Sequence, residues 1–201
     1  MSEESTSESP EKTSVRKRLY LQDGHNVLWT IIYSLVGIGV FVLLSMIPMP
    51  YTMNSLFKFG IAPALAVIGV AAAFRGPIAG FLTGYLGVVT YDLVIRSTVM
   101  TMTLPAIGYG IMGLIVGLAT YNLTNGRSLI KLSVLSAVGF VFTVLIVVAV
   151  SLTVESIATL VALGFVMLPL ITVGLPSVIL LTPVFARVWH AITSRPQSSD
   201  E

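Results

Sequence analysis

Long apolar runs separated by short polar breaks make up most of the chain, and the length of each run predicts the element it forms. A helix needs about 20 apolar residues to cross a hydrocarbon core of about 30 Å. Runs of this kind recur from Val27 onward, with charged residues concentrated at the breaks between them. The pattern predicts membrane-spanning helices over residues 27–47, 56–74, 77–95, 104–121 and 129–152, and a sixth that ends near Ala191.

The C-terminal third is harder to divide into spans than the rest. Residues 154–192 are too many for one helix and barely enough for two, and Pro169, Pro176 and Pro183 interrupt them. A proline inside a helix removes one backbone hydrogen bond and clashes with the preceding turn. With one last span, we expect residues 155–168 to form a short half-helix or loop on the outer side before it. Two spans in this stretch are the alternative.

Composition agrees with the hydrophobic pattern. Of 201 residues, 55% are hydrophobic and 10% are charged, whereas soluble domains carry about 25% charged residues. The mean hydropathy is +0.94. The sequence therefore predicts an integral membrane protein. A net charge of +2 with no basic stripe beyond residues 16–18 argues against nucleic-acid binding, and the absence of cysteine excludes disulfides and thiolate chemistry.

The distribution of lysine and arginine predicts the orientation, because cytoplasmic loops carry an excess of these residues. Six spans with both termini in the cytoplasm leave only Lys58 and Arg96, of eleven lysines and arginines, on the outer side. Seven spans would weaken this bias. We therefore expect an all-α, polytopic protein of the cell membrane, a bundle of six transmembrane helices over residues 19–192. Residues 1–18 are expected to form a disordered cytoplasmic tail, and residues 193–201 a second cytoplasmic tail.

Glycines recur at spacings of three or four residues in two of the expected spans. Such spacing places them on one face of a helix with 3.6 residues per turn. Helices in membranes pack through close backbone approach at small residues. We therefore predict helix-packing surfaces at Gly76, Gly80, Gly84 and Gly87 in one span and at Gly113 and Gly117 in the next.

Charged residues expected in the outer half of the bundle carry the binding hypothesis. Ionisable groups within spans are rare, usually face the bundle interior and mark ligand sites or pathways. Asp92 and Arg96 are four residues apart, so they can pair on one helix face. Aromatic side chains nearby would complete a pocket with a few polar anchors. The predicted substrate-binding residues are Asn54, Lys58, Tyr91, Asp92, Arg96, Tyr109 and Glu155.

Structural roles for the same charged residues stay open. Asp92 and Arg96 could merely neutralise each other at the outer rim. Lys58 could anchor the chain at the membrane interface, and Glu155 could simply end the fifth span.

Motifs for catalysis, metal binding and nucleotide binding are missing from the sequence. It has no GxSxG-type serine, no HExxH pair and no phosphate-binding glycine loop. Its two histidines, His25 and His190, both fall at the expected cytoplasmic rim. We therefore expect a protein that is not an enzyme and that uses no metal or cofactor.

Two segments carry a resemblance to a known family. The run Lys58-Phe59-Gly60-Ile61-Ala62-Pro63 and the run Arg75-Gly76-Pro77-Ile78-Ala79-Gly80, followed by the glycines up to Gly87 and by Asp92, resemble the substrate-binding S components of energy-coupling factor transporters. The resemblance is best over residues 54–92. It implies a six-span protein that captures a vitamin or related micronutrient outside the cell. It also implies a membrane coupling subunit and two cytoplasmic ATPase subunits as partners, which would carry out all ATP hydrolysis.

One feature departs from the family pattern. Family members usually show an Ala-x-x-x-Ala-like pair in the first span for the coupling subunit, whereas this chain has Ser34, Gly37 and Gly39 at other spacings. Two other classes remain as alternatives, a non-transporting membrane scaffold such as a small cell-shape protein and a stand-alone secondary transporter. A scaffold would not need four charged residues to converge on a pocket. A secondary transporter would show an internal repeat with paired broken helices. The substrate itself is not predicted.

Overall fold

Helices make up nearly all of the computed structural model, which describes residues 24–47, 51–54, 57–97, 103–154 and 158–193. For residues 24–26, 51–54, 57–60 and 96 it describes the backbone only. Within this part of the chain, four helices are long and apolar enough to span a membrane. The prediction of an all-α bundle of membrane-spanning character agrees with this. The predicted tails lie outside the described residues, apart from Thr193.

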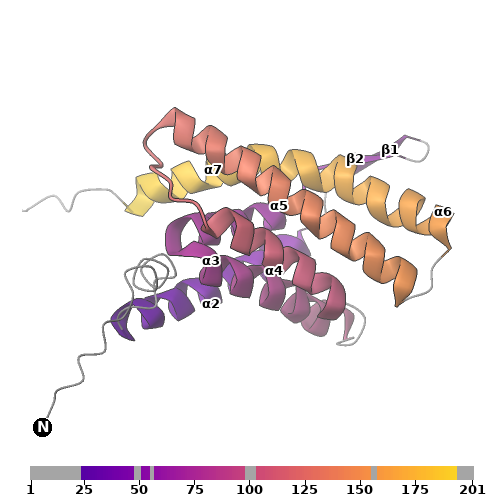
Figure 1. Ribbon diagram of the computed structural model, residues 1–201, viewed down its shortest axis with the longest axis horizontal. Coiled ribbons are helices and arrows are strands. Elements are labelled where there is room, and N and C mark those ends of the chain that lie inside the picture. The colour runs from indigo at the N-terminus through magenta and orange to yellow at the C-terminus, as the bar shows by residue number, and fades with distance from the viewer. Residues whose placement is uncertain (1–23, 48–50, 55–56, 98–102, 155–157, 194–201) are drawn as a thin grey trace, which may run out of the picture.

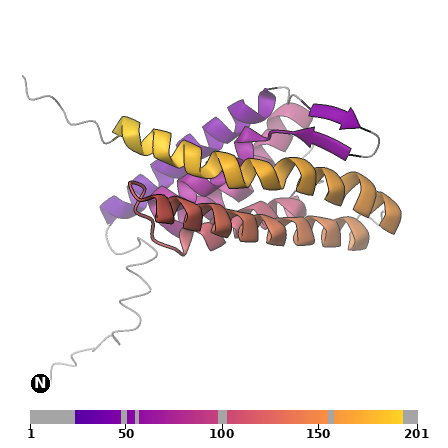
Figure 2. The same cartoon turned by 90° about the horizontal axis from the view of Figure 1, so that it is seen from above.

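The helices form two layers (Figure 1). In that view α5 and the C-terminal helix that includes α7 lie over α2, α3 and α4, and the view from above shows α5 and α7 running alongside each other (Figure 2). The bounds are α2 Gly24–Met46, α3 Pro63–Tyr91, α4 Thr103–Gly117, α5 Gly126–Thr153 and α7 Leu175–Thr193.

Helix α3 turns back on itself at Gly76 and therefore consists of two antiparallel limbs. Gly76 has φ 80° and ψ −169°, a backbone conformation that is essentially restricted to glycine. Pro77 follows at the start of the second limb, where its missing N–H costs nothing. The limbs, residues 63–75 and 77–91, pack together, since a Cβ built at Gly80 would lie 2.6 Å from the Cβ of Ala72. The predicted boundary between two helices at residues 74–77 is confirmed.

Glycines bring the second limb of α3 into backbone contact with α4. A Cβ at Gly80 would lie 2.5 Å from the carbonyl oxygen of Gly113, and a Cβ at Gly84 would meet the carbonyl oxygen of Tyr109. A Cβ at Gly117 would meet the backbone of Pro77. Any side chain at these positions would push the two helices apart, so only glycine permits this spacing.

Small residues of α2 face α3 in the same way. A Cβ at Gly37 would lie 2.8 Å from Oγ1 of Thr83, and a Cβ at Gly87 of α3 would lie 3.1 Å from the ring of Phe41. Ser34 is buried, and its hydroxyl donates to the carbonyl oxygen of Thr30 at 2.8 Å. The small residues of α2 thus serve the packing inside this chain, with the exception of Gly39, which faces open space.

A β-hairpin precedes α3 where the sequence predicts the first turns of the second span. Strands β1 (Tyr51–Asn54) and β2 (Phe57–Gly60) pair antiparallel, so the prediction of a helix from residue 56 is wrong. The alternation of phenylalanine with Lys58 has the period of two that is typical of a strand. Pro63 then starts the helix, because proline suits the first helical turn.

One continuous helix runs over Thr159–Thr193, so the predicted outer half-helix or loop before the last span is wrong over residues 159–168. Pro169 lies between two π-type segments of this helix, and Pro176 lies in the first turn of α7. A π-type turn moves the backbone hydrogen bonds to a wider register and so accommodates the N–H that proline lacks. The segments before α7 are α6 Thr159–Val161, η2 Ala162–Met167 and η3 Leu170–Gly174.

Helix α4 ends at Gly117, four residues before the end that the sequence predicts, and a polar turn leads into α5. Within the turn, Oδ1 of Asn122 accepts a hydrogen bond from the hydroxyl of Thr124 at 2.6 Å. Asn125 caps α5, because its side-chain oxygen accepts from the N–H of Arg127 at 3.1 Å. The predicted fifth span, residues 129–152, is confirmed as a helix and is slightly longer than expected.

Candidate functional site

Asp92 is the one acidic residue in the part of the chain that the structure describes, and it is buried. It begins the π-type segment η1 (Asp92–Arg96), which extends the second limb of α3, and only 2% of its surface is exposed. The segment ends at Ser97, whose φ of 54° is left-handed and whose N–H donates to the carbonyl oxygen of Asp92. Burying a carboxylate within a membrane protein is costly, so such a group commonly marks a ligand site or a pathway.

Two tyrosines lie in one apolar cluster at the same end of the bundle. Tyr91, which precedes Asp92, and Tyr109 of α4 both pack against this cluster, whose buried members are Phe41, Ala64, Val67 and Ile68. Tyr109 also packs against a second cluster that includes Phe140 of α5. The backbone contact between α3 and α4 at Gly84 fixes the position of Tyr109. The structure therefore brings Tyr91 and Tyr109 together beside the chain position of Asp92.

The β-hairpin lies at this end of the bundle too. Its second strand contacts η3, and the views from the front and from above both place the hairpin beside the C-terminal helix (Figures 1 and 2). Just after the hairpin, the N–H of Ala62 donates to Oγ of Ser177 at 2.7 Å. This bond ties the entry of α3 to the start of α7.

Four of the seven predicted site residues lie wholly or partly outside the described part of the structure. The hairpin positions Asn54 and Lys58 through its backbone, with Asn54 opposite Phe57. Their side chains and that of Arg96 lie outside the described part of the structure, and Glu155 lies outside it altogether. A binding role for all seven residues stays a prediction.

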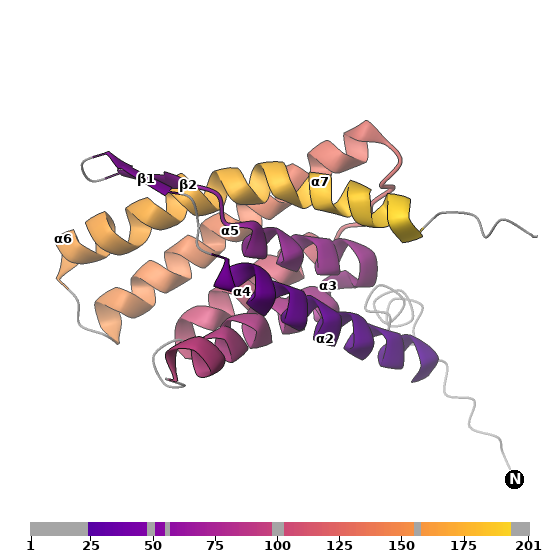
Figure 3. The same cartoon turned by 180° about the vertical axis from the view of Figure 1, so that it is seen from behind.

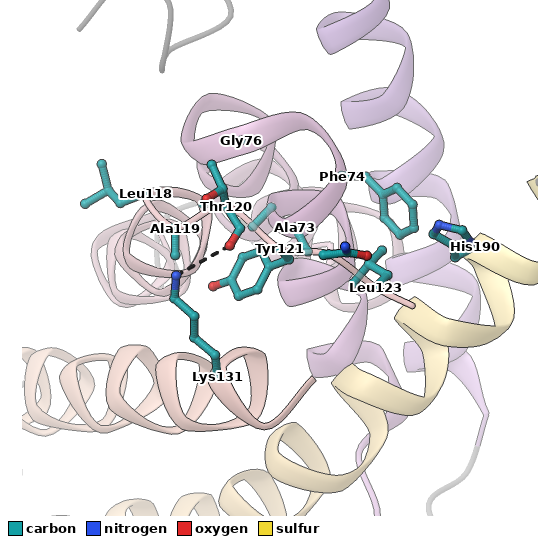
Figure 4. A pocket seen from close by; sticks show the side chains of 13 residues that line it. Ala73, Phe74, Gly76, Leu118, Ala119, Thr120, Tyr121, Leu123, Lys131 and His190 are labelled. Carbon is teal, nitrogen blue, oxygen red and sulfur yellow. Dashed lines mark hydrogen bonds between the residues drawn. The ribbon is translucent and has the colours of Figure 1, made fainter. Parts of the chain in front are cut away.

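A cavity of about 840 Å³ lies at the opposite end of the bundle, where the sequence predicts no site (Figure 4). Its lining comes from the turn at Gly76, the end of α4, the polar turn up to Leu123, Lys131 of α5 and His190 of α7. The parts of the lining before residue 77, from 117 to 131 and at His190 are far apart in the chain, so the cavity as a whole leaves no local pattern. Thr120, Tyr121 and Asn122, which are polar residues next to each other after α4, are the local signal that the sequence offers.

Lys131 and Tyr121 belong to the polar lining of this cavity, together with Thr120, Asn122 and His190. Nζ of Lys131 donates to the carbonyl oxygen of Thr120 at 3.4 Å and lies 5.7 Å from the ring centre of Tyr121. The hydroxyl of Tyr121 donates to the carbonyl oxygen of Val116 at 2.7 Å. Burial raises the pKa of Tyr121 above its ordinary value, so the phenol stays neutral at physiological pH. Lys131 gives this lining a cation with further N–H groups to donate beyond the one bonded to Thr120, which suits an anionic or carbonyl-bearing group.

Within the described residues no group of three or more histidine, cysteine, aspartate or glutamate side chains comes close enough to hold a metal ion.

Comparison with known proteins finds no similar protein or structure. No protein-family model, no curated protein and no solved structure matches the chain. The class that the fold itself defines is a multi-pass helical membrane protein.

Proposed function

We propose that the protein is the substrate-capture component of an importer of the energy-coupling factor type, for a vitamin or a related micronutrient. The observation that carries the proposal is the buried carboxylate of Asp92, beside the cluster that contains Tyr91 and Tyr109. The resemblance of residues 54–92 to substrate-binding S components supports it. A membrane coupling subunit and two ATPase subunits supply the energy of transport, in line with a sequence that has no nucleotide-binding motif.

In this proposal the chain crosses the membrane six times, with both termini in the cytoplasm. The crossings are α2, the two limbs of α3, α4, α5 and the helix Thr159–Thr193. The basic residues support this orientation, because Arg75, Arg127, Lys131 and Arg187 all belong to the Gly76 end of the bundle and cytoplasmic sides are rich in such residues. Asp92 then lies on the outer side.

Cysteine labelling in intact cells tests the six crossings. We expect Ser156→Cys to react with an impermeant reagent from outside, and Ser128→Cys and Ser198→Cys to react only after the membrane is opened. Labelling of Ser198→Cys from outside contradicts the six-span arrangement.

Mass spectrometry of the small molecules retained by the purified protein tests the proposed function. We expect the wild-type protein to retain a compound that Asp92→Asn loses. Ser151→Ala is the matched control, because it removes another buried polar group from the same end of the bundle, and it is expected to retain the compound. Thermal unfolding of each variant in detergent shows whether a loss of compound reflects binding or folding.

Partner capture separates this class from the alternatives. From native membranes, the tagged chain is expected to co-purify with ATPase subunits, which neither a scaffold nor a secondary transporter needs. A preparation with no retained compound and no ATPase subunit refutes the proposal.

A further inference from the structure

An apolar groove of about 210 Å³ runs between α2 and α7 along the first limb of α3. The view from behind shows α2 and α7 on either side of this limb (Figure 3). Its floor is one face of the limb, since the lining residues recur at helical spacing: Val67, Val70, Ala71 and Phe74. Its walls are Tyr33, Val36, Val40 and Leu44 of α2 and Phe185, Val188 and Trp189 of α7.

The groove opens toward the surrounding membrane. Val36, Val40 and Val188 are 48%, 36% and 52% exposed, respectively. Because its floor follows a helix of the bundle, the groove runs in the direction in which lipid chains run. Its apolar lining offers an acyl chain a surface that matches its own polarity.

A fixed cation marks one end of the groove. Arg75 follows Phe74 of the floor, and its guanidinium carbon lies 4.6 Å from the ring centre of Tyr33 and 5.8 Å from that of Trp29. These rings hold the guanidinium by cation–π contact, and its five N–H groups can donate to an anion. The one carboxylate within the described residues, Asp92, belongs to the other end of the α3 hairpin.

Both tryptophans of the chain lie at this end of the groove, which indicates its depth in the membrane. Trp29 lies beside Arg75, and Trp189 forms part of the wall. Tryptophan and tyrosine concentrate at the level of the lipid headgroups. Arg75 therefore lies at the depth of the lipid phosphates, and the exposed Arg187, two residues before Trp189 on α7, adds a second positive charge at this end of the bundle.

We propose that this groove binds one anionic phospholipid of the bilayer, with an acyl chain along the floor and the headgroup phosphate on Arg75. The apolar lining selects a lipid, and the cation at headgroup depth selects an anionic one. This site does not rest on the proposed transport function, because its cation, Arg75, lies at the other end of the α3 hairpin from Asp92. The two regions meet at Leu44 and Val67, which line the groove and also belong to the cluster beside Tyr91 and Tyr109.

Native mass spectrometry of the full-length protein, titrated with phosphatidylglycerol and with phosphatidylcholine of identical chains, tests the headgroup. We expect the wild-type protein to bind phosphatidylglycerol about fivefold more tightly, as one basic residue at an anionic headgroup provides. Arg75→Gln is expected to bring this ratio close to one. Arg127→Gln, the same change at the same end of the bundle but away from the groove, is expected to leave the ratio unchanged.

A second pair of variants tests the groove. Val40→Trp fills it from α2 and is expected to weaken the binding of both lipids severalfold, whether or not Arg75→Gln folds. Leu43→Trp places the same ring on α2 at an exposed residue outside the groove and is expected to bind both lipids as the wild type does. Glycerophosphoglycerol, which has no acyl chains, is expected not to compete.

Four results of the binding experiments would overturn the proposal. They are equal binding of the two lipids by the wild type, equal loss in Arg75→Gln and Arg127→Gln, undiminished binding in Val40→Trp, and competition by glycerophosphoglycerol, which would indicate a site for a free anion. A stable dimer that Val40→Trp dissociates would assign the groove to a second copy of the chain and would refute the lipid as its occupant.

Discussion

Replacing Gly80 by alanine is expected to destabilise the bundle, because the backbones of α3 and α4 touch at this residue. A Cβ there would lie 2.5 Å from the carbonyl oxygen of Gly113, whereas ordinary contacts begin at 3.4 Å. The two helices must therefore separate locally by about 0.9 Å, the difference between these two distances. A gap of about 0.5–1 Å forfeits a quarter to a half of the dispersion attraction between the atoms concerned.

The expected change in the free energy of unfolding is the balance of two opposing effects. Overpacking of this kind costs about 1–3 kcal/mol, and alanine favours a helix over glycine by about 1 kcal/mol. With the loosened contacts along the glycine interface added, we expect Gly80→Ala to lower the free energy of unfolding by about 1–2 kcal/mol.

Gly39→Ala is the matched control, since a Cβ at this position of α2 has nothing within 4 Å. Only the helix-propensity term applies there, and we expect a gain of up to about 1 kcal/mol. Reversible unfolding of both variants in mixed micelles, by titration with a denaturing detergent, measures the two changes, which should have opposite signs. A Gly80→Ala protein as stable as the wild type, beside a stabilised Gly39→Ala, refutes the close-approach argument.

The remaining expectations concern the turn of α3, the predicted ion pair and the cavity. Gly76→Ala forces a side chain into the conformation with φ 80° and is expected to cost about 1–3 kcal/mol, seen as a lower unfolding temperature; an unchanged temperature would show that the turn relaxes. Asp92→Asn combined with Arg96→Gln removes both charges while roughly keeping the shape of the side chains. The affinity for the retained compound should fall more than about tenfold at constant stability. An unchanged affinity would show that the pair has only a structural role. Tyr121→Phe loses the hydrogen bond to Val116 and should cost about 0.5–1.5 kcal/mol. Because burial raises the pKa of Tyr121, the unfolded chain ionises first, and the wild type should lose stability as the pH rises above about 10; a Tyr121→Phe protein with the same alkaline slope would contradict this assignment.

Local chemistry made the turn of α3 predictable. Glycine is favoured just past the end of a helix and proline in the first turn of the next, and the glycine spacing identifies the face that approaches a neighbour. The β-hairpin was not predictable in the same way. The stretch around Lys58 is short and apolar enough to fit either a helix or a strand, and the choice depends on the packing of β2 against η3.

The prolines of the C-terminal helix illustrate the same limit. Pro169 favours a break when only its neighbours in sequence are considered. In the folded chain the helix continues through it, because π-type turns on both sides rearrange the hydrogen bonds. For the site, the sequence singled out Asp92 as a charge in an apolar run, and its burial follows the expectation for such a residue. The cavity beside Lys131 could not be found, because three parts of the chain that are distant in sequence form it, residues 72–76, residues 117–131 and His190.

The single-residue turn at Gly76 also restricts how this segment enters a membrane during synthesis. Two helices that insert one after the other need a connecting loop that stays in water while the second one enters. Here no such loop exists between the limbs. The helical residues of the first limb, 63–75, cover about 20 Å of a hydrocarbon core of about 30 Å, so the proposed crossing also needs the residues before Pro63. In the proposed six-span arrangement we therefore expect the two limbs to enter together as a closed hairpin, with Arg75 left on the cytoplasmic side, from which the ribosome feeds the chain.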